Sequence, residues 1–304
     1  MEIVLHLGVH RTGTTSTQAA LDARAGLLAA QGIRAITPRD IRPPPKGGGI
    51  AQLRRSAPAR ALSARMAARD AERQGVRLLV LSDENLLGPA AWLFPRPRAA
   101  SVGLPPMPRT RALYPEAGWR LRLLALALRP WPVRAVVTFR GYAEWSESLF
   151  AHVCRHRPVA GFDVAKPRIF SATGRWPHLI GEIVSAFPVA DAARYEDLAG
   201  DEHAMLARLV GAEAARLCMR GAAKWRNRSM PAEAVEALVA RWRRPDAPEQ
   251  AEREAIVAEH SRPDAPRFAP WTRDEREQLT ALYEDDMAAI AGMGLETRAR
   301  REAE

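Results

Sequence analysis

The amino-acid sequence predicts an α/β fold: a P-loop-type parallel sheet flanked by helices, followed by a mostly helical C-terminal part. Short apolar runs typical of buried strands recur through the first 200 residues, and helical patterns separate them. A loop bounded by glycines joins the first apolar run to the first helix, as in P-loop folds. Beyond residue 200 the pattern is mostly helical, so we expect the strands to lie before it.

The expected elements follow from these patterns in order. Extended segments are expected at residues 3–5, 33–36, 78–81, 135–139 and 189–195. Helices are expected at residues 14–31, 51–74, 121–128, 142–154, 176–187 and 272–290. Between them, residues 43–49 (PPPKGGG) indicate a loop, and the proline-rich stretch 88–117 shows little periodicity, which is typical of functional or mobile loops.

Length and composition favour one domain. A chain of 304 residues with 47% hydrophobic residues can bury one sizeable core. We expect a single domain over residues 1–304, with an α/β core at 1–200 and a helical extension at 201–304. No run of eighteen apolar residues indicates a membrane span, and the first strand begins too early for a signal peptide.

Cysteine usage and charge narrow the class of protein further. Cys154 and Cys218 are the two cysteines and lack C-x-x-C spacing, which favours a reducing cytoplasm and no metal site. The net charge of +10 comes almost entirely from arginine, because the chain has lysine only at positions 46, 166 and 224. No zinc-finger, helix-turn-helix or RNA-binding signature accompanies it, so no nucleic-acid partner is expected. The positive field would attract an anionic nucleotide.

The loop at residues 8–15 (GVHRTGTT) is the strongest functional signal. Its glycines, Gly8 and Gly13, allow the backbone to approach a ligand, and the helix that follows turns its free N–H groups toward an anion. Arg11 adds charged donors, and Thr14 and Thr15 add hydroxyls. The loop differs from an ATP-binding P-loop because Thr14 stands where that motif has lysine. The pattern predicts a phosphate-binding loop of a different kind.

Two further segments place polar residues at the ends of expected strands. Arg140 ends the strand at 135–139, and Ser148 follows eight positions later, two turns into the next helix. Both can face the crevice where parallel sheets bind ligands. Residues 82–85 (SDEN) follow the strand at 78–81, where Glu84 is a candidate general base. His10, in the loop itself, is a second candidate base.

The loop pattern, H-x-G-x-H-[KR]-T-G-T-T-x-x-Q, resembles the phosphosulfate loop of sulfotransferases that use 3′-phosphoadenosine 5′-phosphosulfate (PAPS). The chain looks most similar to bacterial sulfotransferase-family proteins, which usually have lysine where this chain has Arg11. Weaker resemblances extend the match to about residue 290. They lie at residues 81–86 (LSDENL), 139–148, 194–198 (RYEDL), 224–229 (KWRNRS) and 283–286 (YEDD).

This resemblance implies an enzyme that transfers a sulfonate group from PAPS to a hydroxyl or amine of a carbohydrate or small molecule, without a metal. It implies that the loop holds the 5′-phosphosulfate through Gly8, Arg11, Thr12, Gly13, Thr14 and Thr15. Arg140 and Ser148 would bind the 3′-phosphate, with Tyr195 and Arg228 near the nucleotide. Arg11 would also neutralise the leaving group, and Glu84 or His10 would activate the acceptor. Trp92, Phe94 and Trp119 are candidates to stack on the acceptor.

Alternative readings stay open at this point. A P-loop phosphotransferase or NTPase would bind Mg²⁺ at Thr14 or Asp83, because the run before Asp83 imitates a Walker B strand. A non-catalytic protein that binds PAPS or its product is the second alternative, since arginine does not replace lysine neutrally at position 11. Asp83 or Glu84 could instead cap the next turn, and Arg140 could pair with Glu144. Ser146 is the alternative to Ser148.

Overall fold

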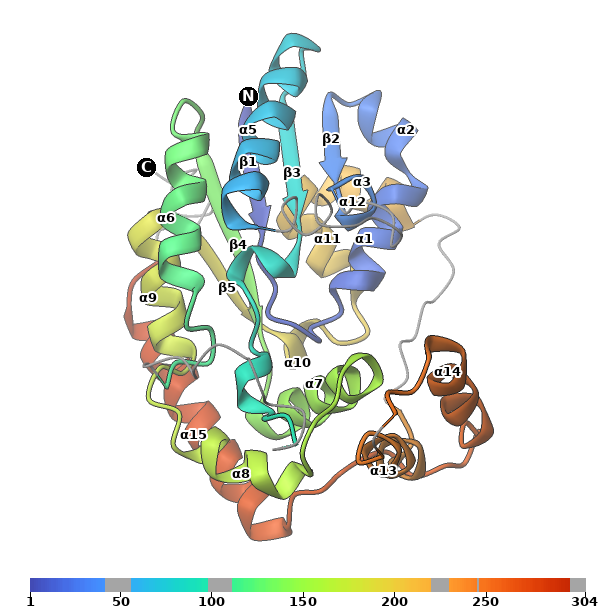
Figure 1. Cartoon of the computed structure of the whole chain (residues 1–304). Helices are drawn as coiled ribbons and strands as arrows, with labels where there is room; N and C mark the ends of the chain where they lie inside the picture. Colours follow the sequence, from blue (N-terminus) through green and yellow to red (C-terminus); the bar gives the residue numbers. More distant parts are fainter. Residues whose placement is uncertain (42–55, 98–110, 220–229, 245, 296–304) are drawn as a thin grey trace.

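The computed structural model describes residues 1–41, 56–97, 111–219, 230–244 and 246–295. Its centre is a sheet of five parallel strands in the order β2-β3-β1-β4-β5, and helices cover both faces (Figure 1). The strands are β1 Glu2–His6, β2 Ile33–Ile36, β3 Leu78–Ser82, β4 Val133–Phe139 and β5 Val189–Arg194. The sequence prediction of an α/β fold with a parallel sheet is confirmed.

The central position of β1 decides where the loop lies. Leu5 of β1 is paired with Leu81 of β3 on one side and with Ala135 of β4 on the other. All three strands run in the same direction, so their carboxyl ends meet at one edge of the sheet. The segments that follow these strands are the loop at 8–15, the turn at 82–85 and the turn at 140–141.

Alternating side chains of the strands pack against two helical layers. Val4, Val80 and Val136 face a cluster that includes Leu21, Leu206 and Leu209, from helices α1 Thr14–Ala23 and α11 Glu202–Val210. Helix α12 Ala212–Met219 joins this layer. Helices from beyond residue 200 therefore cover a face of the central sheet.

The opposite face carries the larger core. Its members include strand residues Ile3, Leu5, Leu79 and Val137, together with residues of the covering helices. These helices are α5 Ala57–Arg73, α6 Ala117–Leu128 and α9 Trp176–Ala186. Burial on both faces explains why each strand is a nearly continuous apolar run in the sequence.

The remaining helices gather beyond the carboxyl edge of the sheet (Figure 1). Helix α7 Tyr142–His156 starts directly after β4, and the long helix α15 Arg273–Gly292 packs against α7 and α9. Between them in sequence lie α8 Phe162–Phe170, α10 Tyr195–Leu198, α13 Ala232–Arg241 and α14 Gln250–Glu259. Among the described helices none combines the length and apolar character needed to cross a bilayer.

Several element boundaries differ from the sequence expectation. The helix expected at 14–31 is two helices, α1 and α2 Ala25–Ala29, because the backbone of Arg24 leaves the helical region (φ −120°, ψ 16°). Tyr195 does not extend β5 but begins α10. Helix α8 was not expected, and it contains Pro167 near its C-terminal end. Short helices α3 Pro38–Ile41, η1 Glu84–Leu87 and η2 Ala91–Leu93 complete the described elements.

A buried polar network fixes α7, α9 and α15 to one another. Arg175, which precedes α9, donates two hydrogen bonds to the carboxylate of Asp286, at 2.6 and 3.0 Å. The Tyr142 hydroxyl at the start of α7 donates to the same carboxylate at 2.6 Å. That hydroxyl also accepts from the backbone N–H of Trp176 at 3.1 Å. Asp286 thus accepts three hydrogen bonds from two side chains, and the buried Tyr142 hydroxyl has no access to water that could replace the carboxylate.

We predict that Asp286→Ala destabilises the protein by about 2–4 kcal/mol, because it leaves a partly buried guanidinium and a hydroxyl without their acceptor. Urea unfolding followed by tryptophan fluorescence measures the change. The control is Asp285→Ala, an exposed carboxylate of the same helix, which should change stability by less than about 0.5 kcal/mol. Equal unfolding midpoints for the two variants would contradict the role of this network.

Candidate functional site

The phosphate-binding loop leaves β1 along β4 and then turns sharply into α1. The N–H groups of Leu7 and Val9 donate to the carbonyls of Val136 and Thr138, at 2.8 and 3.3 Å. The Thr12 hydroxyl closes the turn by donating to the Val9 carbonyl at 2.7 Å. Among the described residues Arg11 is the one non-glycine with positive φ, at 73°. Such a conformation costs free energy and is typical of functional loops.

The two loop glycines are required by space and by backbone conformation. A methyl group on Gly8 would lie 2.8 Å from Thr14 Cγ2 and 3.0 Å from Thr12 Oγ1, closer than atoms normally approach. Gly13 has φ 77°, and a methyl group there would lie 3.3 Å from the Tyr195 ring. Larger residues would therefore push the loop open.

The start of α1 can hold an anion. Thr14 is the first residue of this ten-residue helix, and no acidic residue occupies its first turn. The first N–H groups of a helix have no acceptor within the helix, and its dipole is positive there. Gly13 and Thr15 are exposed, whereas Thr12 and Thr14 are buried. The exposed part of the loop is thus a place where an anion can meet backbone donors.

Arg11 joins this loop to α7. Its Nε donates to Ser148 Oγ at 2.9 Å, and its carbonyl accepts from Arg140 Nη1 at 2.9 Å. Burial, together with the positive charge of Arg140, lowers the pKa of Arg11. Two guanidinium groups at one loop repel each other, and a bound anion would remove that repulsion.

Tyr195 lies beside the loop at Gly13, next to Arg140. The Arg140 guanidinium lies over the Tyr195 ring, 4.9 Å from its centroid, in cation–π geometry. Arg140 does not pair with Glu144, which instead forms an ion pair with Arg276 at 2.6 Å. The structure therefore brings Arg11, Arg140, Ser148 and Tyr195 together from four separate segments.

Ser146 does not face the loop. Its hydroxyl donates to the Ala143 carbonyl at 2.9 Å and accepts from the Trp271 indole at 3.2 Å. Two residues farther along α7 the side chain points about 200° around the helix, which is why Ser148 rather than Ser146 meets Arg11.

The two acidic residues that follow β3, Asp83 and Glu84, lie in different environments. Asp83 is fully buried, forms an ion pair with Arg60, and caps η1 by accepting from the Asn85 N–H at 3.0 Å. Glu84 lies beside α1, where its Oε2 accepts from Gln18 Nε2 at 3.4 Å. The capping role considered for this pair belongs to Asp83, whereas Glu84 stays at the edge of the loop.

His10 is held by a tyrosine that sequence reasoning missed. The His10 N–H donates to the Tyr114 hydroxyl at 3.0 Å, and Nδ1 lies 2.9 Å from the same oxygen. That hydroxyl can donate its proton to Nδ1, which leaves the imidazole proton on Nε2. Tyr114 lies in the proline-rich stretch 104 positions away, so no local signal indicates the contact.

A fully buried histidine, His6, lies in the strand that precedes the loop. His6 Nδ1 lies 2.8 Å from Ser82 Oγ, which also accepts from Gln18 Nε2 at 3.1 Å. Burial lowers the pKa of His6 to about 4. His6, Ser82 and Gln18 thus tie β1, β3 and α1 together below the anion-binding turn.

Some expected residues lie elsewhere. Arg228 and the segment 224–229 fall outside the described residues. Phe94 is buried in the core, and the Trp92 indole donates to the Leu113 carbonyl at 3.3 Å. The suggestion that Phe94 stacks on an acceptor is therefore wrong, because its ring packs on Phe150 and Phe162. Trp119 is exposed on α6.

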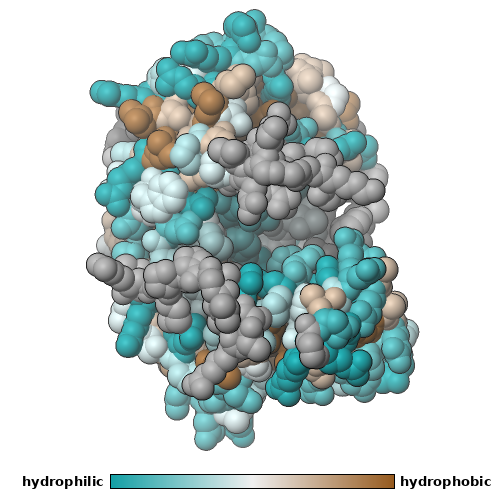
Figure 2. Space-filling view, viewed as in Figure 1, coloured by the Kyte–Doolittle hydropathy of each residue, from teal (hydrophilic) through white to brown (hydrophobic). Residues whose placement is uncertain are grey.

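The surface near the loop is concave. Figure 2 shows that this face of the molecule is hollowed near its middle. In the matching view of Figure 1, this region lies between α1 with its preceding loop and the helices α7, α13 and α14. A ligand held by the loop can therefore extend toward α7.

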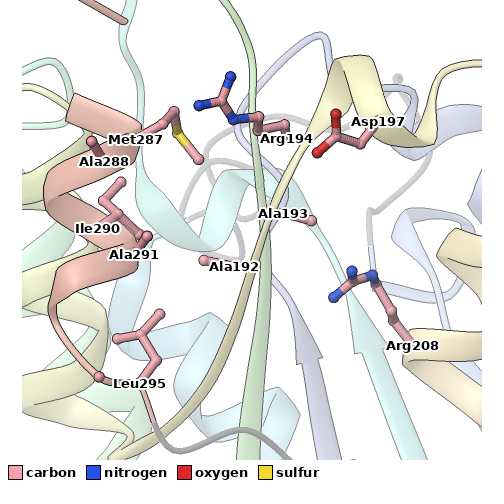
Figure 3. Close-up of a pocket in the computed structure, with 11 residues that line it drawn as sticks. Ala192, Ala193, Arg194, Asp197, Arg208, Met287, Ala288, Ile290, Ala291 and Leu295 are labelled. Atoms are coloured by element: carbon pink, nitrogen blue, oxygen red, sulfur yellow. The ribbon is translucent and has the colours of Figure 1, made fainter. Parts of the chain in front are cut away.

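A separate cavity of about 480 Å³ lies at the outer edge of β5 (Figure 3). Apolar residues line one side: Met287 and Ile290 of α15, and Leu295 just beyond the end of that helix. Arg194 and Arg208 lie on the other side, but carboxylates neutralise both, Glu284 at 2.7 Å and Asp191 at 2.5 Å. The Asp197 carboxylate also lines this cavity, and neither arginine there is left to neutralise a bound anion, in contrast to Arg11 and Arg140 at the loop.

Comparison of the chain with protein-family models, with curated proteins and with solved structures found no match.

Proposed function

We propose that this protein is a sulfotransferase that moves a sulfonate group from PAPS to a hydroxyl or amine acceptor. The observation that carries the proposal is the contact of the loop with α7, in which Arg11 Nε meets Ser148 Oγ and Arg140 Nη1 meets the Arg11 carbonyl. A nucleotide with phosphates at both its 5′ and 3′ positions needs two neighbouring anion sites. The loop before α1 supports one, and the Arg140–Ser148 turn supports the other.

The donor would lie with its 5′-phosphosulfate on the loop between Gly8 and Thr15. Backbone N–H groups and threonine hydroxyls would hold the non-bridging oxygens. Tyr195, which already lies beside Gly13 and under Arg140, would border the nucleotide. Arg11 can break its contact with Ser148 and turn its guanidinium toward the phosphosulfate, which frees the serine hydroxyl for the 3′-phosphate.

In the proposed reaction the acceptor oxygen attacks sulfur as the bond from sulfur to the bridging phosphate oxygen breaks. Arg11 would neutralise the charge that develops on the leaving oxygen. Glu84 would take the acceptor proton, since its carboxylate lies at the loop edge beside Gln18. His10 suits this role less well, because its Nδ1 already lies in hydrogen-bond contact with the Tyr114 hydroxyl, at 2.9 Å.

The surroundings of Asp83 support a magnesium-dependent phosphotransferase or NTPase less well than a sulfotransferase. A Walker B carboxylate must be available to a metal near the phosphates. Asp83 is fully buried, with its carboxylate engaged by Arg60 and by both N–H groups of Asn85. The alternative of a protein that binds PAPS or PAP without catalysis depends on Arg11. Arginine keeps the positive charge that the proposed mechanism needs, but it differs in shape from lysine.

We predict that Arg140→Ala weakens binding of 3′-phosphoadenosine 5′-phosphate (PAP) by about 1.5–3 kcal/mol, the usual contribution of a charge-assisted contact. Binding of adenosine 5′-phosphosulfate, which lacks the 3′-phosphate, should change far less. Calorimetry measures both affinities. Arg122→Ala removes an exposed arginine of α6 as the charge-matched control, and neither ligand should respond. If Arg140→Ala weakens both nucleotides alike, Arg140 does not read the 3′-phosphate.

We predict that Glu84→Gln lowers sulfonate transfer by about 10²–10⁴-fold, the usual loss when a positioned base is removed. PAP affinity should stay nearly unchanged, because the amide keeps the shape of the carboxylate. Release of PAP from PAPS over a panel of sugars, phenols and lipid alcohols measures the rate. A fully active Glu84→Gln enzyme, together with an inactive His10→Asn enzyme, would transfer the role to His10.

A further inference from the structure

One face of α7 continues away from the Arg11 contact. Ser148, His152 and His156 are spaced four residues apart, so they follow one another along a single side of the helix. The two imidazole rings lie 4.7 Å apart and are both exposed. Each step of four residues advances about 6 Å along the helix. The proposed reaction uses neither histidine.

Positive charge lies at the loop end of this face. Desolvation and the charge of Arg11 lower the pKa of His152, and the same two causes act on His156 with Arg155 and Arg253. With its pKa lowered to about 4, the His152 imidazole is uncharged at neutral pH, and the pKa of His156 is shifted in the same direction. A neutral imidazole both donates and accepts hydrogen bonds. The charge along this face comes from the arginines.

Arg253 of α14 closes the far end. Trp242 of α13 donates its indole N–H to the Cys154 carbonyl of α7 at 2.6 Å, and the Arg253 guanidinium lies 5.5 Å from the Trp242 ring. This stacking holds Arg253 near His156, whose pKa it lowers. Arg11, His152, His156 and Arg253 form a row, which we call the α7 row.

Nearby carboxylates neutralise little of the α7 row. Glu144 and Glu147 lie on another side of α7 and pair with Arg276, at 2.6 and 2.5 Å. Arg253 donates to the Pro248 carbonyl at 2.5 Å and Arg11 to the Ser148 hydroxyl at 2.9 Å. The negative charge of Glu84, at the loop end, raises the pKa of Arg11 and of His152 and so partly opposes the larger lowering effects.

We propose that the α7 row binds an acidic oligosaccharide, with carboxylate or sulfate groups on Arg253 and hydroxyls on the two histidines. The inference rests on the proposed function, because it makes this oligosaccharide the sulfonate acceptor. Such a chain places a hydroxyl at Arg11 and Glu84 and anionic groups one or more helical turns away. Uncharged imidazoles beside arginines suit a ligand that alternates hydroxyls with charges. The row lacks a free aromatic platform for bases, since Arg253 covers the Trp242 ring.

The test is calorimetry of a heparin-derived hexasaccharide at low and at physiological salt, with neutral maltohexaose as the comparison ligand. The wild-type protein should bind the acidic hexasaccharide, more weakly as salt rises, and should not bind maltohexaose. Arg253→Gln should weaken hexasaccharide binding about 3- to 10-fold, and the double variant His152→Ala/Arg253→Gln about 10- to 100-fold. Arg253→Lys keeps the charge and should retain most of the affinity.

Arg69→Gln removes an exposed arginine of α5 and should leave hexasaccharide affinity unchanged. PAP affinity, measured in parallel, should stay within about twofold in every variant of His152 and Arg253. If hexasaccharide binding is indifferent to these variants, the α7 row is not its site. The acidic-oligosaccharide proposal would also be overturned if a single-stranded oligonucleotide of equal charge bound as tightly as the hexasaccharide and lost affinity to the same extent in the His152 and Arg253 variants. Row-dependent saccharide binding without any PAP binding would preserve the row and refute the proposed function.

Discussion

The attachment of the loop at 8–15 to the β4–α7 turn is the constraint on which the candidate site depends. One hydrogen bond joins Arg11 to Ser148, and another joins Arg140 to the Arg11 carbonyl. Both are possible because β1 and β4 are neighbours in a parallel sheet and end at the same edge. The buried Asp286 network holds α7 against α9 and α15, so the serine is presented from a fixed helix. Loop and helix therefore form one structural unit, which carries the two proposed anion sites.

Two positive charges repel each other within this unit. Arg11 and Arg140 lie close enough that the charge of one lowers the pKa of the other, and Arg11 adopts a left-handed backbone conformation. An anion placed between the two guanidinium groups would offset their repulsion, so the proposed site favours a highly charged ligand over a neutral one. The α7 row continues this positively charged surface along the helix, with two histidines between Arg11 and Arg253.

The sequence predicted the sheet well because parallel strands are buried on both faces and leave continuous apolar runs such as 78–81. It also predicted that Arg140 and Ser148 lie at the edge where the strand ends converge, but not that Arg11 donates a hydrogen bond to Ser148. It did not predict Tyr114 beneath His10, because that contact spans 104 positions and has no local pattern. The break at Arg24 was missed because arginine is a good helix former and gives no local stop signal, and α8 was missed because Pro167 is a residue that usually ends a helix. Arg228 lies outside the described residues.

We propose that this loop selects a nucleotide with a 3′-phosphate and needs no metal to do so. Calorimetric titration of the wild-type protein with PAP in EDTA, and with ATP in the presence and absence of Mg²⁺, tests it most directly. We expect PAP to bind in EDTA with the same affinity as in Mg²⁺, and ATP to bind far more weakly in both conditions. ATP binding that equals or exceeds PAP binding and requires Mg²⁺ would contradict it.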